Sequence, residues 1–370
     1  MRQDDSAATL AAPLMRRFSR SQATAPVRVA VIGYGYWGPN LVRNVIERPD
    51  LELVEVCELS DARADACRQR LPGVRVVAGL DAVLGEATTE AVIVATPPHT
   101  HHQIVAAALR AGKHVLVEKP LATTSADARD LIEIAADNDV LLMPGHTFVY
   151  SPAVNLVGEL IAAGDIGEVY FVTSSRMNLG KYQHGGVLCD LAPHDLSILL
   201  RWIDSPIEQV SATGCSVFRP DNPETAFMTL QFASGPTANV QLSWLAPRKV
   251  RQTVVVGSRR MIVYDDTASD EPVRIYDRGM DVAEPSTFGE HQLVCRTGDV
   301  VIPRIEPAEP LALELADFGD CIRSGAEPKS NAALGLAIVA ALEAAERSLN
   351  AYGAPFWLGD PARRGAPVGA

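Results

Sequence analysis

The part of this 370-residue chain that most constrains its fold lies near the N-terminus, where the apolar run Val27–Ile32 leads into three closely spaced glycines. Gly33 is suited to a tight turn, Gly35 to close approach of a pyrophosphate, and Gly38 to close packing of a helix on the strand. Pro39 falls in the first turn of that helix, where a missing N–H costs no hydrogen bond. This order of strand, glycine turn and helix predicts a dinucleotide-binding turn, with the pyrophosphate on the helix N-terminus.

An acidic residue at the end of the next apolar run completes the fingerprint. Glu58 lies twenty residues after Gly38, at the position where a carboxylate binds the ribose hydroxyls of NAD. The same carboxylate repels the additional phosphate of NADP. The sequence therefore predicts NAD as the cofactor, and Arg63 is the feature that keeps NADP as the less favoured alternative.

From residue 27 to 148, short β-rich runs alternate with longer helical ones, which is typical of a doubly wound parallel sheet. The six expected strands are Val27–Ile32, Leu53–Cys57, Val74–Val77, Ala91–Ala95, His114–Val117 and Val140–Met143. Ligands of such sheets lie beyond the carboxyl ends of the strands. The residues predicted to contact the cofactor are therefore those of the glycine turn, the acid and two strand ends: Gly33, Gly35, Tyr36, Trp37, Gly38, Glu58, Thr96, Pro97, Glu118 and Lys119.

The second part of the chain, residues 149–370, has a different texture. After a helix expected over Ala153–Ala163 come long alternating segments with short turns, which predict a mostly antiparallel sheet. The expected strands are Glu168–Met177, Gln209–Val217, Ala226–Phe232, Ala238–Leu245, Gln252–Val256 and Met261–Asp265. Two amphipathic helices, Leu311–Arg323 and Ala332–Ala351, are expected to pack back on the core. The predicted fold class is an α/β Rossmann domain followed by an α+β domain with an open sheet.

Composition narrows the possible partners. A formal charge of −12 disfavours nucleic acid and anionic membrane, because both require a basic surface. No run approaches the length of a membrane span, and six scattered cysteines indicate reduced thiols, so a cytoplasmic enzyme is expected. Residues 1–26 are expected to form a disordered tail. His99, His101 and His102 cluster without an acid at ligand spacing, so no metal site is predicted.

Several segments carry a family resemblance. They are the glycine turn, ATPPHTHHQIVAAALRAGKHVLVEKPLA over residues 95–122, DLAPHDLSIL over 190–199 and PLALELADFGDCIRSG over 310–325. They resemble the Gfo/Idh/MocA oxidoreductases. The resemblance implies a Rossmann domain, hydride transfer between NAD(P) and a sugar or cyclitol carbon, and an open sheet domain that serves as the contact of a homodimer or homotetramer. It also implies that His101 packs near the cofactor.

Three residues are predicted to carry the chemistry. Lys119 is suited to hydrogen-bond the reacting oxygen and to stabilise charge there, with Glu118 expected to hold its ammonium in place. His194 follows Asp190 by four residues, so one helical turn brings imidazole and carboxylate together, and such a partner raises the pKa of the imidazole. The resemblance implies that Asp190 and His194 line the substrate site. Whether Lys119 or His194 is the base stays open, and a relay through both also fits.

The sequence around this pair points to a substrate class. DLAPHDLSIL and the preceding SSRMNLGKYQ resemble the family branch that contains UDP-N-acetylglucosaminuronate 3-dehydrogenases. The resemblance implies that Arg176, Asn178, Lys181 and Tyr182 bind a substrate carboxylate or diphosphate, with Arg176 and Lys181 as a cationic rim of the site. Cys189 departs from the large aromatic expected before Asp190, so the pocket differs from that pattern.

Alternatives from other substrate and protein classes are kept open. An inositol, another cyclitol or a free sugar fits the same pocket. The scaffold also serves NAD-dependent glycoside hydrolases, which lack the DLAPHD pattern, and non-catalytic regulators that bind a dinucleotide. Retention of Lys119, Asp190 and His194 argues against a regulator.

Overall fold

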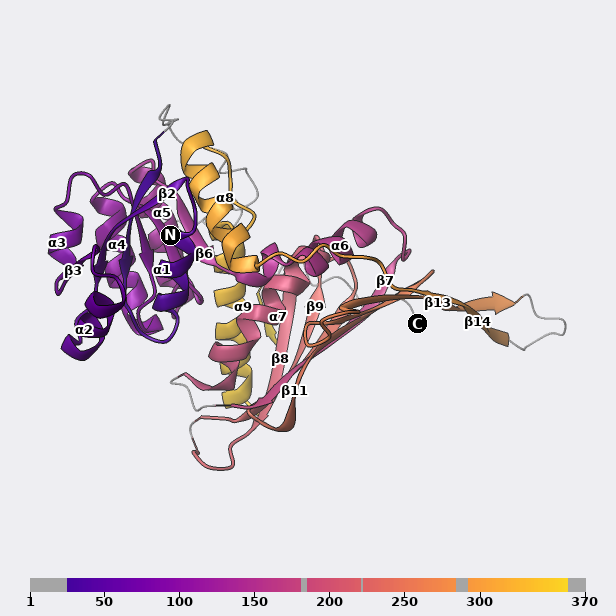
Figure 1. The fold of residues 1–370 in the computed structure, drawn as a ribbon. Helices are drawn as coiled ribbons and strands as arrows, with labels where there is room; N and C mark the ends of the chain where they lie inside the picture. The colour runs from indigo at the N-terminus through magenta and orange to yellow at the C-terminus, as the bar shows by residue number, and fades with distance from the viewer. Residues whose placement is uncertain (1–24, 181–184, 221, 284–291, 359–370) are drawn as a thin grey trace, which may run out of the picture.

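The computed structural model describes residues 25–180, 185–220, 222–283 and 292–358 (Figure 1). The predicted tail up to residue 24 and the predicted substrate residues Lys181 and Tyr182 lie outside these ranges. Two sheets organise the described chain, and each carries helices.

The first sheet has six strands in the order β3-β2-β1-β4-β5-β6, all of them parallel. Its strands are β1 Val27–Ile32, β2 Leu51–Cys57, β3 Arg75–Val77, β4 Ala91–Val94, β5 His114–Glu118 and β6 Leu142–Gly145. The strand order reverses between β1 and β4, which places the turn after β1 at the crevice where doubly wound folds bind dinucleotides. The predicted Rossmann fold is confirmed, and strand bounds differ from the expected ones by no more than two residues.

Helices cover both faces of this sheet. They are α1 Gly38–Ile46, α2 Asp61–Arg70, α3 Leu80–Leu84, α4 His101–Arg110 and α5 Ser125–Asp137, with a 3-10 turn at Pro98–Thr100. The helix α5 begins at Ser125, because the Thr124 side chain accepts the Asp127 N–H at 3.1 Å and caps the helix. Side chains of β1 alternate between two apolar clusters, one on each face of the sheet.

The second sheet has nine strands in the order β14-β13-β12-β11-β7-β10-β9-β8-β15. The strands are β7 Val169–Leu179, β8 Ile207–Cys215, β9 Thr225–Phe232, β10 Thr237–Ser243, β11 Leu245–Gly257, β12 Met261–Asp265, β13 Val273–Ala283, β14 Gln292–Val301 and β15 Phe356–Trp357. All pairs are antiparallel except β7 with β10, so the expected mostly antiparallel sheet is confirmed. The strands β13, β14 and β15 were not predicted. The hairpin of β13 and β14 extends away from the helices (Figure 1).

A short 3-10 turn and four helices complete the described part of the chain. They are a 3-10 turn at Thr147–Tyr150 and the helices α6 Pro152–Ala162, α7 Gly186–Trp202, α8 Pro310–Ser324 and α9 Ala332–Asn350. The helix α8 adds Leu315 and Phe318 to the apolar cluster on one face of the Rossmann sheet. The helix α9 adds Ile338 to the core of the second sheet and Val339 to the Rossmann cluster on the other face. The boundary at residue 148 stays a prediction, since these last two helices join both parts.

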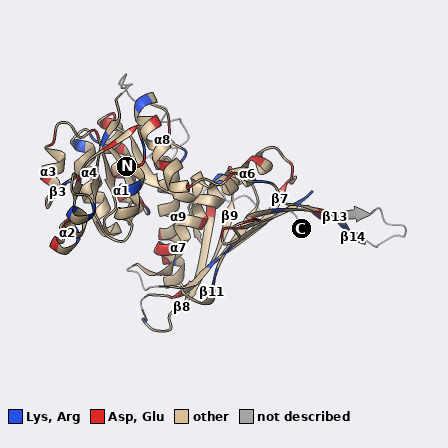
Figure 2. Ribbon diagram, in the orientation of Figure 1, with Lys and Arg blue, Asp and Glu red and all other residues tan. Residues whose placement is uncertain are grey.

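Charged residues are spread over both parts of the molecule rather than gathered on one element (Figure 2). Within the described ranges, none of the helices is long and apolar enough to cross a membrane.

Candidate active site

The turn after β1 has the backbone shape that its glycines predict. Gly33 has a φ of +101°, and a Cβ there would lie 2.7 Å from the carbonyl oxygen of Ala95. A Cβ on Gly38 would overlap the carbonyl oxygen of Gly33, so α1 packs directly on the turn. A Cβ on Gly35 would meet no protein atom within 4 Å, which leaves this side of the turn accessible to a pyrophosphate. The turn therefore fits a dinucleotide in its backbone geometry as well as in its sequence.

Glu58 occupies the position expected for the ribose-binding acid, just after β2, and is 5% exposed. Its Oε2 accepts the Tyr34 backbone N–H at 2.8 Å, and its Oε1 accepts the Ser60 N–H at 2.8 Å and an Arg63 N–H at 2.9 Å. Burial alone would raise the pKa of Glu58, but these hydrogen bonds and the charge of Arg63 lower it. The carboxylate is therefore ionised. It has about four acceptor positions, which leaves capacity for ribose hydroxyls.

The loops after β4 and β5 are tied together by one buried imidazole. His101 has no exposed surface, and its two ring nitrogens each lie 2.8 Å from a carbonyl oxygen, Nε2 from Thr96 and Nδ1 from Pro120. Burial lowers the pKa of His101, and the contacts with the Pro120 and Thr96 carbonyl oxygens act in the opposite direction. The side chain therefore lies beneath these loops, of which Thr96 is half-buried and Pro97 is exposed.

The two aromatic residues of the glycine turn lie differently. Tyr36 is 90% exposed, whereas Trp37 is 38% exposed. Burial raises the pKa of Glu118 to about 7, against the lowering effects of the Lys119 charge and of hydrogen bonds from the Lys119 backbone and Trp37. At neutral pH this carboxyl is close to the midpoint of its titration.

Lys119 reaches from the end of β5 to α7 in the second part of the chain. Its Nζ donates to the Asp190 carbonyl oxygen at 2.7 Å and lies 3.4 Å from the Asp190 Oδ1. The expectation that Glu118 holds this ammonium is wrong, because neighbouring residues of an extended chain point to opposite sides and Asp190 takes this place. Lys119 and Asp190 are separated by 71 positions, and the fold brings them into one ion pair.

The expected pairing of Asp190 with His194 is also wrong. The Asp190 Oδ2 accepts the indole N–H of Trp244 at 3.1 Å, while Oδ1 faces Lys119. The His194 ring instead packs edge-on against Phe148, with the ring centroids 5.1 Å apart. Its Nδ1 is buried without a hydrogen-bond partner in the part of the chain that the structure describes.

Consequently the pKa of His194 moves in the direction opposite to the one expected. Burial lowers this pKa well below the ordinary value of 6.5, and the positive charges of Lys119, Arg176 and Arg251 lower it further. The imidazole is therefore neutral at pH 7. Lys119 presents an ammonium beside it.

Arg176 does not lie on an exposed rim, and that part of the prediction is wrong. The alternation along β7 points Arg176 into the protein, where it is 3% exposed and its Nε donates to the Asp195 Oδ2 at 2.6 Å. The Ser174 hydroxyl donates to the other oxygen of this carboxylate at 2.7 Å. The Arg176 Nη1 and the Asn178 Oδ1 are buried and have no hydrogen-bond partner among the described residues.

A second arginine was missed by the sequence. Arg251 lies directly opposite Arg176 in the register of β11 and β7, and both guanidinium groups lie over the Phe148 ring, at 5.8 and 4.6 Å from its centroid. The Arg251 side chain is 30% exposed, and its Nη1 pairs with Asp266 at 2.7 Å. The expected strand began one residue later, at Gln252, so the alternation that would have included Arg251 was not used. Arg251 is the more accessible cation beside His194.

Two further buried titratable side chains were missed. His146, after β6, is 1% exposed, and burial together with the charge of Lys119 lowers its pKa to about 3. Glu314 on α8 has no exposed surface and accepts the Thr147 hydroxyl at 2.9 Å. Burial and the nearby Glu118 raise the pKa of Glu314 well above its usual range. His146 belongs to no motif, and Glu314 lies in the segment PLALELADFGDCIRSG, whose family resemblance assigned this residue no role.

The structure does not support Cys189 as a nucleophile or the His99, His101 and His102 cluster as a metal site. The Cys189 thiol donates to Glu346 at 3.1 Å, and burial raises its pKa, which keeps it protonated rather than nucleophilic. His99 is exposed, and His102 contacts Asp130 at 2.7 Å. Over the described ranges, no group of three or more His, Cys, Asp and Glu side chains has the arrangement of a metal site.

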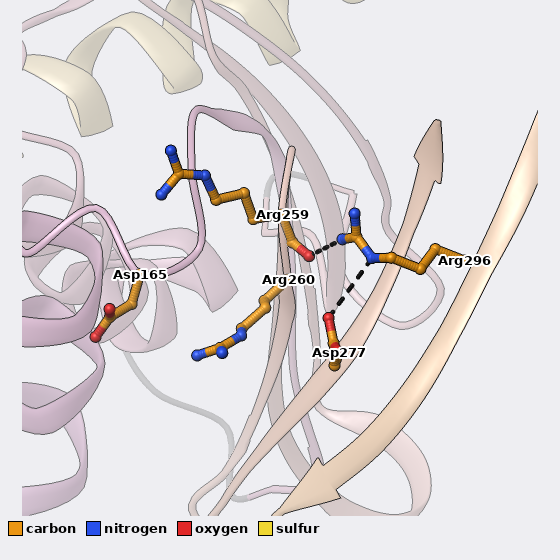
Figure 3. A pocket seen from close by; sticks show the side chains of 5 residues that line it. All are labelled: Asp165, Arg259, Arg260, Asp277 and Arg296. Carbon is orange, nitrogen blue, oxygen red and sulfur yellow. Dashed lines mark hydrogen bonds and ion pairs between the residues drawn. The ribbon is translucent and has the colours of Figure 1, made fainter. Parts of the chain in front are cut away.

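A separate hollow lies between the loop before β7, the turn that joins β11 to β12, and the strands β13 and β14, and it shares no residue with this site (Figure 3). The Arg296 Nε lies 3.6 Å from the Asp277 Oδ1, and the same guanidinium donates to the Arg259 carbonyl oxygen. The residues that line the hollow are Asp165, Arg259, Arg260, Asp277 and Arg296.

Comparison with known proteins gives two adjacent family matches. Residues 27–146 match the oxidoreductase family with an NAD-binding Rossmann fold, Gfo/Idh/MocA, and residues 154–263 match the Gfo/Idh/MocA C-terminal domain. An uncharacterised oxidoreductase of Streptococcus pneumoniae is 33% identical over 150 residues, which cover 40% of this chain and 40% of that relative.

Longer matches extend over most of the chain. The scyllo-inositol 2-dehydrogenase (NAD(+)) of Bacillus subtilis is 27% identical, covering 82% of this chain and 88% of the relative. The solved structure of UDP-N-acetylglucosamine 3-dehydrogenase GnnA from Acidithiobacillus ferrooxidans is 25% identical, with a TM-score of 0.73, covering 88% of this chain and 98% of that one.

Proposed function

Because this chain belongs to the Gfo/Idh/MocA family of oxidoreductases with an NAD-binding Rossmann fold, we propose that it transfers a hydride between NAD and a secondary hydroxyl group of a nucleotide-linked sugar. One observation carries the proposal. Lys119 at the end of a Rossmann strand meets Asp190 on α7, next to the neutral His194. Acid–base groups therefore gather at the carboxyl edge of the sheet where a nicotinamide is expected.

In the oxidation direction, NAD supplies the hydride acceptor. The Lys119 ammonium donates to the substrate oxygen and stabilises the negative charge that develops there. We assign the hydroxyl proton to His194, since its imidazole is neutral and Nδ1 lacks a partner among the described side chains. Asp190 holds the Lys119 ammonium in place through both its carbonyl and its carboxylate oxygens. In this proposal His194, rather than Lys119, is the base.

We expect NAD to bind more tightly than NADP. The ionised Glu58 would lie against the ribose hydroxyls and repel a phosphate, and Arg63, already bonded to Glu58, is less available to attract one. Calorimetric titration of the wild type with both cofactors tests this. The Glu58→Gln variant should lose part of the preference, and Arg63→Gln is the matched control. Tighter binding of NADP by the wild type, abolished in Arg63→Gln, would assign the pocket to Arg63.

An anionic sugar is favoured by the charge around His194. Arg251 is partly exposed and lies over the same Phe148 ring that the His194 ring contacts. Arginine is well suited to a carboxylate or phosphate, because its planar fork can form two parallel hydrogen bonds. Arg251 thus replaces Arg176 as the proposed contact for a hexuronate carboxylate or a diphosphate, and Lys181, Tyr182 and Asn178 stay proposed substrate residues.

A substrate screen tests the proposed function. Nucleotide-linked hexoses, nucleotide-linked hexuronic acids, inositols and free sugars are each offered with NAD, and nicotinamide absorbance is followed. We expect a nucleotide-linked sugar to be turned over fastest, as the name of the GnnA relative suggests. Faster turnover of inositol would assign the chain instead to the chemistry named for its Bacillus relative.

Two rival functions from other classes are separated by related assays. An NAD-dependent glycoside hydrolase would release the aglycone from an aryl glycoside with only catalytic amounts of NAD. A non-catalytic regulator would bind NAD but reduce it with no sugar in the screen. Lys119 and His194, gathered beside one another, favour the dehydrogenase.

We further propose a cytoplasmic homodimer or homotetramer. One face of the nine-stranded sheet is covered by α7 and α9 (Figure 1). On the other face, Phe171 and Phe227 are 45% and 46% exposed. Exposed aromatic side chains on an open sheet are typical of a protein interface, which makes this face the proposed subunit contact.

A further inference from the structure

One side chain outside every motif contacts the centre of the candidate site. Trp244, between β10 and β11, is 2% exposed, and its indole N–H donates to the Asp190 Oδ2 at 3.1 Å. We infer that Trp244 is a positioning residue, which fixes the Asp190 carboxylate so that its other oxygen faces Lys119. The inference rests on the proposed role of Lys119 and Asp190 in hydride transfer, and it adds a residue to that site.

The indole is held in place by its own backbone. The backbone N–H of Trp244 donates to the Glu224 carbonyl oxygen at 2.9 Å. The backbone carbonyl oxygen of Trp244 accepts the Gly180 N–H at 3.1 Å. Gly180 also sets the space beside the ring, since a Cβ there would lie 2.8 Å from Cδ1 of Trp244. Strand ends and a glycine therefore restrict the ring to one orientation, the one that aims Nε1 at Asp190.

This bond accounts for the way Asp190 divides its contacts. A carboxylate on a helix is free to rotate toward a neighbour one turn along, which here is His194. With Oδ2 bonded to the indole, Oδ1 is directed to the Lys119 ammonium, 3.4 Å away. Trp244 thereby acts on the reaction through Asp190 and Lys119, and it leaves His194 neutral and without a carboxylate partner.

The chain offers a matched control for loss of a buried indole hydrogen bond. Trp202 is 3% exposed, and its N–H donates to the Val154 carbonyl oxygen at 2.8 Å, within the core of the second sheet. Trp202→Phe and Trp244→Phe remove the same chemical group and keep an aromatic ring. Both substitutions should lower thermal stability to a similar degree. Only Trp244→Phe removes a hydrogen bond to the Asp190 carboxylate.

A first experiment needs no substrate. The full-length protein is labelled with ¹⁵N at its four tryptophans, and the indole N–H signals are assigned by the Trp244→Phe and Trp202→Phe variants. In an Asp190→Ala background, we expect the Trp244 signal to move upfield because its acceptor is gone, while the Trp202 signal stays in place. A Trp244 signal that does not move would overturn the inference, whatever the enzyme turns over.

A second experiment uses the substrate that the screen identifies. We expect Trp244→Phe to lower kcat about tenfold to a hundredfold, as for loss of a hydrogen bond to a charged group, with KM for NAD unchanged. Gly180→Ala, whose Cβ would lie 2.8 Å from the indole Cδ1, should displace the ring and lower kcat in the same way. Trp202→Phe should keep the wild-type kcat.

These experiments test the positioning role of Trp244 and the proposed sugar dehydrogenase activity separately. An unchanged kcat in Trp244→Phe, or an equal loss in Trp202→Phe, would overturn the positioning role even if the enzyme is a sugar dehydrogenase. Failure of every sugar in the screen would overturn the proposed function, while the labelled-tryptophan experiment would still test whether Trp244 holds Asp190.

Discussion

Lys119→Ala and His194→Ala are each expected to lose turnover by a factor of about 10²–10⁴ while binding NAD as the wild type does, because acid–base groups contribute on this scale to rate and not to cofactor affinity. Asp190→Asn should lower kcat by a smaller factor, since Lys119 would keep its bond to the main-chain oxygen of residue 190. Steady-state kinetics and calorimetric titration with NAD measure the two quantities separately.

Exposed residues of the same types provide the controls for this prediction. His99→Ala and Lys249→Ala remove an imidazole and an ammonium from the protein surface and should leave kcat unchanged. The pH dependence of kcat gives a further test of His194. Because the folded-state pKa of His194 is depressed, its neutral form persists below pH 6.5, so lowering the pH from 7.5 to 6 should not reduce kcat through this residue. A wild-type kcat in either active-site variant would remove that residue from the mechanism.

Arg176→Met is expected to lower the free energy of unfolding by about 3–5 kcal/mol, the usual cost of leaving one partner of a buried ion pair without its counterion. The charge left behind would be that of Asp195, which is 2% exposed. Denaturation in urea measures the loss. Arg251→Met, directly across the sheet, removes a guanidinium whose side chain is 30% exposed and should cost no more than about 1 kcal/mol.

A double variant distinguishes this structural role from substrate binding. Adding Asp195→Leu to Arg176→Met removes the unpaired charge and should recover a large part of the lost stability. If Arg176 instead served the substrate, the single variant would keep its stability and raise KM. Equal losses of stability in Arg176→Met and Arg251→Met would contradict the distinction between the buried and the partly exposed pair.

The Rossmann fold could be predicted from the sequence because short β-rich runs alternate with helical runs between residues 27 and 145, and the glycine turn marks the start of the first helix. The hairpin of β13 and β14 could not. Its sequences, VRIYDRGMDVA and QLVCRTGDVV, place arginine and aspartate among apolar residues, and Met280 and Val301 are exposed, so no buried face imposes a clear alternation.

The sequence predicted several residues of the site but not which of their side chains contact each other. Four-residue spacing pointed Asp190 at His194, but a helix position has more than one neighbour in space. The contacts of Asp190 come instead from Lys119 and Trp244, which are 71 and 54 positions away. Only the tertiary fold decides between a local and a distant partner. The same limit applies to Arg176, whose counterion lies on another element.

The packing of α8 and α9 determines when the Rossmann domain can complete its core during synthesis on the ribosome. The last strand of the Rossmann sheet ends at Gly145, yet Leu315, Phe318 and Val339, which complete the apolar layers on its two faces, belong to the final helices. An emerging N-terminal half therefore has its strands without their full cover. The parts of the two apolar faces that α8 and α9 cover stay open to water, and to chaperones, until synthesis reaches these helices.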